Sequence, residues 1–97
     1  MFLQNVRELN RFFKALTSAS RLRIVHQLAG SRGEVSVGEL AAQLHMSQPL
    51  VSWHLRDLRR INLVLMRRNG RQALCSLNRQ RLAYFQAQFT ELLKESH

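Results

Sequence analysis

The residues best suited to chemistry in this sequence lie in one segment, SQPLVSWHLRDLRR, from Ser47 to Arg60. The side-chain oxygen of the first serine can cap a helix, and the proline two residues later fits the first helical turn. The segment ends with three arginines against one acid, Asp57. Because such an excess of positive charge on a helix attracts anions, the pattern predicts a polyanionic neighbour.

Side chains near the start of the segment carry groups that can read base edges in duplex DNA. Gln48 can form two hydrogen bonds to adenine, the two serines can bond bases or phosphates, and Leu50 can contact a thymine methyl group. Trp53 could face the DNA or pack against a neighbouring helix, whereas the arginines suit phosphates. The predicted DNA contacts are Ser47, Gln48, Pro49, Leu50, Ser52, Trp53, Arg56, Arg60, Arg67, Arg68 and Arg71.

Charge and composition favour nucleic acid as this polyanion. The 97 residues are expected to form a single domain over residues 1–97, with a net charge of +9, and the stretch from His45 to Arg81 holds eight arginines and one acid. Such a local concentration of arginines is more typical of a DNA-binding surface than of a generally arginine-rich composition or of binding to an anionic membrane. No apolar run approaches the roughly 20 residues that span a bilayer. The first residues lack a signal-peptide cleavage site, so we expect a cytoplasmic protein.

Other kinds of site lack the residues they need. The single cysteine, Cys75, excludes an internal disulfide and leaves an intersubunit disulfide or an adduct as the redox alternatives. The four histidines fall on separate elements and are expected to be helix-surface and turn residues, with His54 bonding a backbone group beside the core or a phosphate. The glycines are isolated turn residues. We therefore predict no enzyme activity, no cofactor and no metal site.

The elements that must position the opening segment follow from local signals. Ser36 and Glu39 have the spacing of a capping box, so a short helix should begin there and end near His45. Ser47 starts the next helix almost at once, and two helices joined so closely form a helix-turn-helix over residues 36–61. On a helical wheel, the inward face of the second helix carries Val51, Leu55, Leu58 and Ile61.

The segments on either side of the helix-turn-helix also carry start and stop signals. A helix should begin at Ser18 or Ser20 and end in a left-handed turn at Gly30. Weak alternation over residues 34–37 indicates a short strand, and Asn62 is a left-handed helix terminator. Because Asn69-Gly70 favours a type I′ turn, residues 63–77 should form a β-hairpin. The inward residues of the helix before the strand are expected to be Leu22, Val25 and Leu28, with Ile24 as a further candidate.

Amphipathic helices bracket the chain, over residues 1–17 and 79–96, and Asn78 can cap the second. Each carries an apolar stripe at helical spacing. A chain this small cannot bury two long helices fully against itself, so the stripes predict a homodimer. The predicted interface residues are Phe2, Val6, Leu9, Phe13, Leu82, Phe85, Phe89 and Leu92.

Nearly the whole chain resembles the ArsR/SmtB family of bacterial regulators. The matching stretches are LTSASRLRIVHQL, EVSVGELAAQLHMSQPLVSWHLRDLRR and INLVLMRRNGRQALCSLN, and members of the family typically read S-Q-x-x-V-S-x-H-L within the second. The predicted order α-α-(β)-α-α-β-β-α is mainly α with a small β-hairpin, and the resemblance implies a winged helix-turn-helix whose wing is this hairpin. It further implies a homodimeric repressor that binds an inverted repeat in double-stranded DNA, with the first and last helices at the dimer interface.

The sequence departs from the metal-sensing branches of that family. Three residues, Ser36, Val37 and Gly38, stand where arsenic and cadmium sensors carry Cys-Val-Cys. The positions matching the zinc ligands hold Arg79, Arg81, Leu92 and Glu95. The resemblance therefore implies no known metal-sensing site, and the inducing signal could be a small-molecule effector, a thiol modification or no ligand at all. A protein-interaction module and a non-specific architectural DNA-binding protein are the alternative functions.

Overall fold

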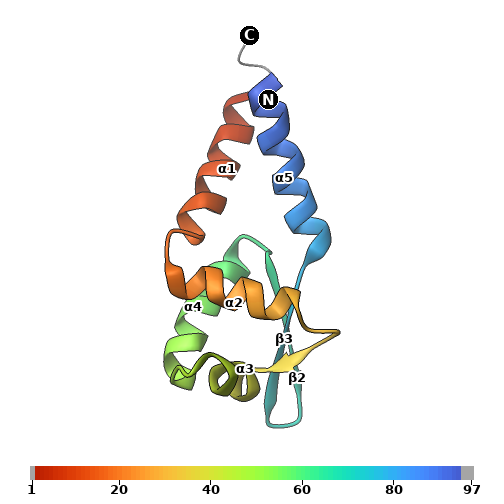
Figure 1. The fold of residues 1–97 in the computed structure, drawn as a ribbon. Helices are drawn as coiled ribbons and strands as arrows, with labels where there is room; N and C mark the ends of the chain where they lie inside the picture. Colours follow the sequence, from red (N-terminus) through yellow and green to blue (C-terminus); the bar gives the residue numbers. More distant parts are fainter. Residues whose placement is uncertain (1, 95–97) are drawn as a thin grey trace.

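The computed structural model describes residues 2–94, with side chains from Val6 onward. The molecule is elongated, measuring 50 × 22 × 20 Å, with α1 and α5 side by side at one end and the β2–β3 hairpin at the other (Figure 1). The elements are α1 (Phe2–Ala15), α2 (Ala19–Ala29), β1 (Val35–Ser36), α3 (Val37–Leu44), α4 (Gln48–Arg60), β2 (Val64–Asn69), β3 (Gln72–Leu77) and α5 (Arg79–Lys94). This order of helices and strands confirms the predicted mainly α fold.

Four helices begin at the polar residues that the sequence indicated. Ser18 accepts a hydrogen bond from the N–H of Arg21, and Ser47 accepts one from Leu50, so each satisfies a donor that the first helical turn leaves free. Ser36 and Glu39 form the predicted capping box at the start of α3. The side chain of Asn78 accepts from the N–H of Arg81 in the first turn of α5.

Two of the helices are followed by residues in the left-handed conformation, but neither of these residues is Gly30, where the sequence predicted such a turn. His45, between α3 and α4, has φ 56°, and Asn62, after α4, has φ 62°, which confirms the prediction for Asn62. Gly30 has φ −82°, so the predicted left-handed turn there is wrong. Its N–H instead bonds back to His26 O within ordinary helical geometry. The left-handed residue at position 45 gives the helix-turn-helix its sharp turn.

The sheet has three antiparallel strands in the order β1-β3-β2, so the short strand adds to the hairpin. Asn69 pairs with Gln72, which leaves Gly70 and Arg71 as the two-residue turn. Gly70 has φ +61° whereas Asn69 does not have a positive φ, so the predicted type I′ turn at Asn69-Gly70 is wrong. A positive φ at the first central residue alone, here Gly70, fits a type II′ turn. Glycine adopts this φ without the steric strain that a side chain would cause.

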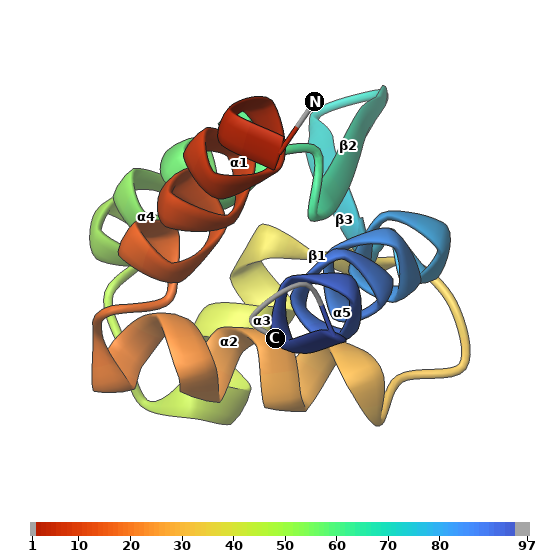
Figure 2. The same cartoon turned by 90° about the horizontal axis from the view of Figure 1, so that it is seen from above.

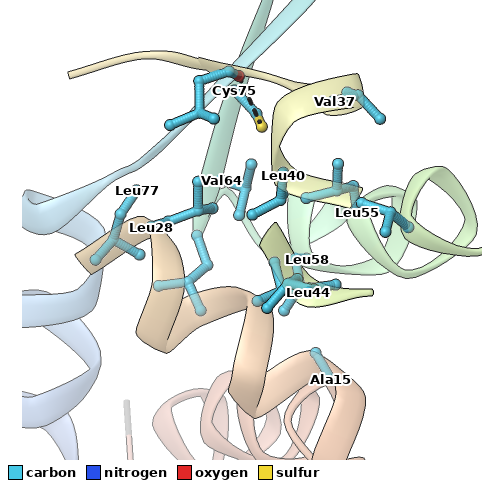
Figure 3. Close-up of a cluster of buried hydrophobic side chains, with 14 of the residues drawn as sticks. Ala15, Leu28, Val37, Leu40, Leu44, Leu55, Leu58, Val64, Cys75 and Leu77 are labelled. Atoms are coloured by element: carbon cyan, nitrogen blue, oxygen red, sulfur yellow. Dashed lines mark hydrogen bonds between the residues drawn. The ribbon is translucent and has the colours of Figure 1, made fainter. Parts of the chain in front are cut away.

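The core lies between the helix-turn-helix and the sheet. Val51, Leu55 and Leu58 of α4 are fully buried, which confirms its predicted inward face, and Ile61 is partly buried. Figure 3 shows leucines from three helices converging with residues of the sheet: Leu28, Leu40, Leu44, Leu55, Leu58, Val64, Cys75 and Leu77. Each fully buried leucine contributes about 2 kcal/mol to the unfolding free energy. This packing fixes the direction of α4.

The inward face of α2 differs from the prediction at one position. Ile24 and Leu28 are buried, whereas Leu22 is 53% exposed. The prediction for Leu22 is therefore wrong. Because α2 is only three turns long and packs against α3, α4 and β3, its contact face is set by those neighbours rather than by its own apolar spacing.

Helices α1 and α5 pack on each other through aromatic rings. Phe12 stacks on Phe85 with ring centroids 4.4 Å apart, and Phe85 is 1% exposed. Leu9 is 3% exposed. Leu9 and Phe85 therefore belong to the core of one chain and offer no surface to a partner, which corrects their assignment to a dimer interface. The remaining predicted interface residues are outward or partly buried, and the side chain of Phe2 lies outside the described residues.

Candidate nucleic-acid interface

All eleven predicted DNA contacts are exposed, and four of them line one cleft between α4 and the hairpin. Gln48 and Ser52 come from the first half of α4, and Arg68 and Arg71 come from the hairpin. The cleft has a volume of about 440 Å³ and is closed on its third side by the start of α3. The structure therefore brings a group that can read bases next to groups that bind phosphates. Arg56 and Arg60 do not line this cleft.

Gln48 lies over the first turn of α3. A Cβ atom on Gly38 would lie 3.0 Å from Gln48 Nε2, which is tighter than most such contacts in proteins. The glycine thus leaves the space in which the amide of Gln48 lies. The preceding residue, Val37, is buried, so the backbone that forms this surface is held by the core.

The arginines of the hairpin differ in whether they pair with a carboxylate. Arg67 Nε donates to Glu34 Oε2 at 2.6 Å, and this hydrogen bond lowers the pKa of the Glu34 carboxyl. Arg68 and Arg71 form no ion pair with any residue that the structure describes. A second cleft, between α4 and β2, is lined by Arg59, Arg67 and Arg68. The arginines that lack a carboxylate partner are the better candidates for phosphate contacts.

A hydrogen-bonded network joins α2 to α4. Arg21 Nε donates to His54 Nδ1 at 3.1 Å, and Arg21 Nη2 lies 2.6 Å from Asp57 Oδ2. His54 is 7% exposed, so it lies beside the core as predicted, but its partner is the side chain of Arg21 and not the predicted backbone group or phosphate. Burial, and secondly the positive charge of Arg21, lower the pKa of His54. The neutral imidazole is thereby kept as the acceptor.

Trp53 lies beside this network. The guanidinium carbon of Arg21 is 5.4 Å from the centre of the Trp53 ring, and the side chain is 50% exposed. The ring therefore packs against Arg21 of α2 while half of its surface stays open, and its contact with DNA stays a prediction. Sequence reasoning missed Arg21, although the single acid of α4, Asp57, was a signal that a cation elsewhere in the chain should pair with it.

Comparison with known proteins identifies the family. Residues 18–65, from the start of α2 into β2, match the family described as bacterial regulatory protein, arsR family. The chain is 38% identical over 96 residues to a transcriptional repressor SmtB homolog of Synechocystis sp., and the match covers 99% of this chain and 71% of that protein. The chain belongs to the arsR family.

Other relatives agree with this assignment. An arsenical resistance operon repressor of Staphylococcus xylosus is 36% identical over 78 residues, covering 80% of this chain and 73% of that protein. An ArsR-like transcriptional regulator from Rhodococcus sp. superposes with a TM-score of 0.81 at 26% identity, covering 93% and 83% of the two chains. Reduced HlyU from Vibrio cholerae gives 0.71 at 32% identity, covering 87% of each. The protein is a DNA-binding transcriptional regulator with a winged helix-turn-helix fold.

Three of the positions that the resemblance matches to metal ligands, Ser36, Arg79 and Arg81, have structural roles here. Ser36 is the buried cap of α3. Arg79 donates to Ala29 O at 2.8 Å, and Arg81 donates to Ile61 O at 3.1 Å, so both hold the start of α5 against the ends of other helices. Glu95 lies outside the described residues. Among residues 2–94, no group of three or more His, Cys, Asp and Glu side chains is placed to hold a metal ion.

Cys75 is a core residue of the sheet. It is 0% exposed, and its Sγ donates to Val35 O at 3.3 Å (Figure 3). Burial, with a smaller contribution from Glu34, raises the pKa of the thiol to about 11. Since the thiolate is the reactive form, this environment does not favour oxidation or adduct formation.

Within residues 2–94, no helix is long and apolar enough to cross a membrane.

Proposed function

We propose that the protein is a homodimeric repressor that binds an inverted repeat in double-stranded DNA. The N-terminal half of α4 enters the major groove, and the wing contacts the adjacent backbone or minor groove. The observation that carries the proposal is the cleft that joins Gln48 and Ser52 to Arg68 and Arg71. Base selection comes mainly from Gln48 and its serine neighbours, and affinity comes mainly from the arginines. A regulator of transcription acts where the chromosome lies, so the cytoplasm is its expected location.

The dimer interface is proposed to lie on the outer faces of α1 and α5. Phe13 and Phe89 meet edge to face with centroids 5.4 Å apart and are 43% and 41% exposed. Val6 is 38% exposed on the same side of α1, and Leu82 and Leu92 are partly buried beside the core. Two aromatic rings in contact, with a valine on the same side of α1, form the kind of apolar patch that a twofold partner covers. Twofold symmetry then places one recognition helix on each half of an inverted repeat.

The decisive experiment is selection of bound duplexes from a random pool by the full-length chain. Recovery of an inverted repeat is the expected result. Equal recovery of unrelated duplexes would favour an architectural protein, and failure to retain any duplex would favour a protein-interaction module. Repeating the selection with divalent metals tests the sensor function separately, because loss of binding with one metal would reveal a metal site that the motifs do not indicate.

A further inference from the structure

A cationic cleft lies on the side of the molecule away from the wing tip. It has a volume of about 480 Å³ and is formed by the end of α1, the start of α2 and the end of α4. Figure 2 shows α1 on the same side of the molecule as α4, with α5 on the other side. The volume lies within the range of small-molecule sites, which is about 300–1,000 Å³.

Charge in this cleft is strongly unbalanced. Four of its side chains are cations, Arg11, Lys14, Arg21 and Arg60, against the single acid Asp57. The carboxylate of Asp57 is already engaged by Arg21 at 2.6 Å and by Arg60 at 3.4 Å. Arg11 and Lys14 form no side-chain hydrogen bond or ion pair with any residue that the structure describes. Two free cations in a concave site create a positive potential that selects an anion.

Apolar groups complete the lining. Ala15 is 6% exposed, and Ile61 is partly buried against the core, so both contribute fixed apolar surface to the lining of the cleft. We propose that this cleft binds a small anionic effector that carries a carboxylate or phosphate group on a compact apolar body. The anionic group bonds Arg11 and Lys14, and the apolar body lies against Ala15 and Ile61.

The cleft shares one residue, Arg60, with the predicted DNA contacts, and none of its other lining residues is among them. Arg60 is the last residue of α4, and Gln48 is the first. With a rise of about 1.5 Å per residue, the two lie about 18 Å apart along the helix axis. On α1, the basic residues Arg11 and Lys14 occupy a different face from the apolar Val6 and Phe13, so a partner subunit on the apolar face leaves the cleft open.

Arg21 connects this cleft to α4, the proposed recognition helix. It lines the cleft and also holds His54 and Asp57 of α4 through hydrogen bonds. A bound anion competes with Asp57 for Arg21 and neutralises positive charge beside α4. Both effects weaken DNA binding, so the effector acts as an inducer; this second step rests on the proposed function, whereas the site itself does not.

The site is tested on the free, full-length protein without DNA. Amide chemical shifts are followed during titration with inorganic phosphate, with benzoate and with neutral benzamide, at constant ionic strength set by chloride. Saturable shifts at Ala15 and Ile61 are expected with phosphate or benzoate, and the arm that saturates first identifies the anionic group. Benzamide should produce none. Absence of saturable shifts with both anions would overturn the proposal.

Variants on one face of α1 supply the matched control. Arg11→Gln combined with Lys14→Gln should weaken anion binding by at least about tenfold, because two charge-assisted contacts are lost. Arg7→Gln removes the same kind of charge from an exposed position of α1 outside the cleft, and should leave the affinity unchanged. Equal losses in both variants would show non-specific attraction and reject the site.

The coupling to DNA is measured with a duplex from the selection experiment. Saturating anion should weaken duplex binding by about five-fold or more in the native protein and not in the doubly substituted one. Anion binding without this change would reject the role of Arg21 while leaving the site in place. If the duplex itself protects Arg11 and Lys14 in the anion-free protein, the cleft belongs to the DNA interface and the effector site is rejected.

Discussion

At the scale of single residues, Gly38 leaves open the space beside the amide of Gln48. Gly38→Ala places a methyl group within 3.0 Å of the mobile end of the Gln48 side chain, so this amide must move while the backbone need not. Position 38 lies in the first turn of α3, where alanine favours helix, so the melting temperature should not fall. We expect a changed preference at one base position of the operator, with a discrimination of about 1–3 kcal/mol lost or redirected.

Binding to a set of operators altered one base pair at a time measures this effect. Gln48→Ala is the reference, because it should relax preference at the same position. An unchanged profile for Gly38→Ala, with an altered one for Gln48→Ala, would show that the contact with Gly38 does not direct the amide. Altered preference at different positions in the two variants would contradict the proposed role of Gln48.

At the scale of elements, the link between α2 and α4 depends on a neutral His54. Its pKa is lowered in the folded protein from an ordinary value of 6.5, chiefly by burial and then by Arg21. Folding therefore disfavours the imidazolium. The contribution of His54 to the unfolding free energy is complete above the unfolded pKa and is lost as the pH falls through the lower folded pKa. We expect the native protein to become less stable between about pH 7 and about pH 5.

Urea unfolding at several pH values checks this prediction. His54→Asn keeps an acceptor for Arg21 but does not titrate, so its stability should change less with pH over that interval. His26→Asn, at an exposed position of α2, should retain the pH dependence of the native protein. If His54→Asn and the native protein follow the same pH curve, the buried imidazole is not the group responsible.

The elements that the sequence predicted well are those decided by local chemistry. Ser36 with Glu39, Ser47 and Asn78 each satisfy donors within their own helical turn, so their roles follow from spacing alone. The turn of the hairpin was predicted one residue early, because Asn-Gly can occupy either of two registers and strand pairing chose between them.

Features that depend on contacts between distant elements were not predictable in this way. Leu22 and Ile24 were both candidates for the inward face of α2. Only Ile24 is buried, because the positions of α3 and α4 decide which side of α2 faces the core. Arg21 is 36 residues from its carboxylate partner Asp57. Phe85 belongs to a regular apolar stripe, yet a stripe does not reveal whether the ring that covers it comes from the same chain or from another.

At the scale of the whole molecule, the exposed aromatic pair between α1 and α5 should decide the oligomeric state. Phe89→Arg places a charge in the proposed interface, where it would be buried without a partner, so we expect monomers with poor operator binding. Phe89 is 41% exposed in the single chain, so the variant should still fold. Sedimentation velocity, with circular dichroism to confirm folding, measures the outcome.

Leu22→Arg is the matched control for that variant. Leu22 is 53% exposed on α2 and is not among the proposed interface residues, so this substitution adds the same charge outside that set. It should remain dimeric. A dimer that persists in Phe89→Arg, or that is lost equally in both variants, would move the interface elsewhere.

The distribution of arginines sets how DNA binding should respond to salt. If a dimer neutralises about eight phosphates through the wing and α4, log K should fall against log salt with a slope of about −7. Arg71→Ala should make the slope less steep by about two, one contact per subunit, and weaken binding to all sequences alike. Arg67→Ala should change the slope less, because Glu34 already compensates that charge at 2.6 Å. Titrations at several salt concentrations test all three values, and a native slope shallower than about −2 would contradict phosphate neutralisation as the main source of affinity.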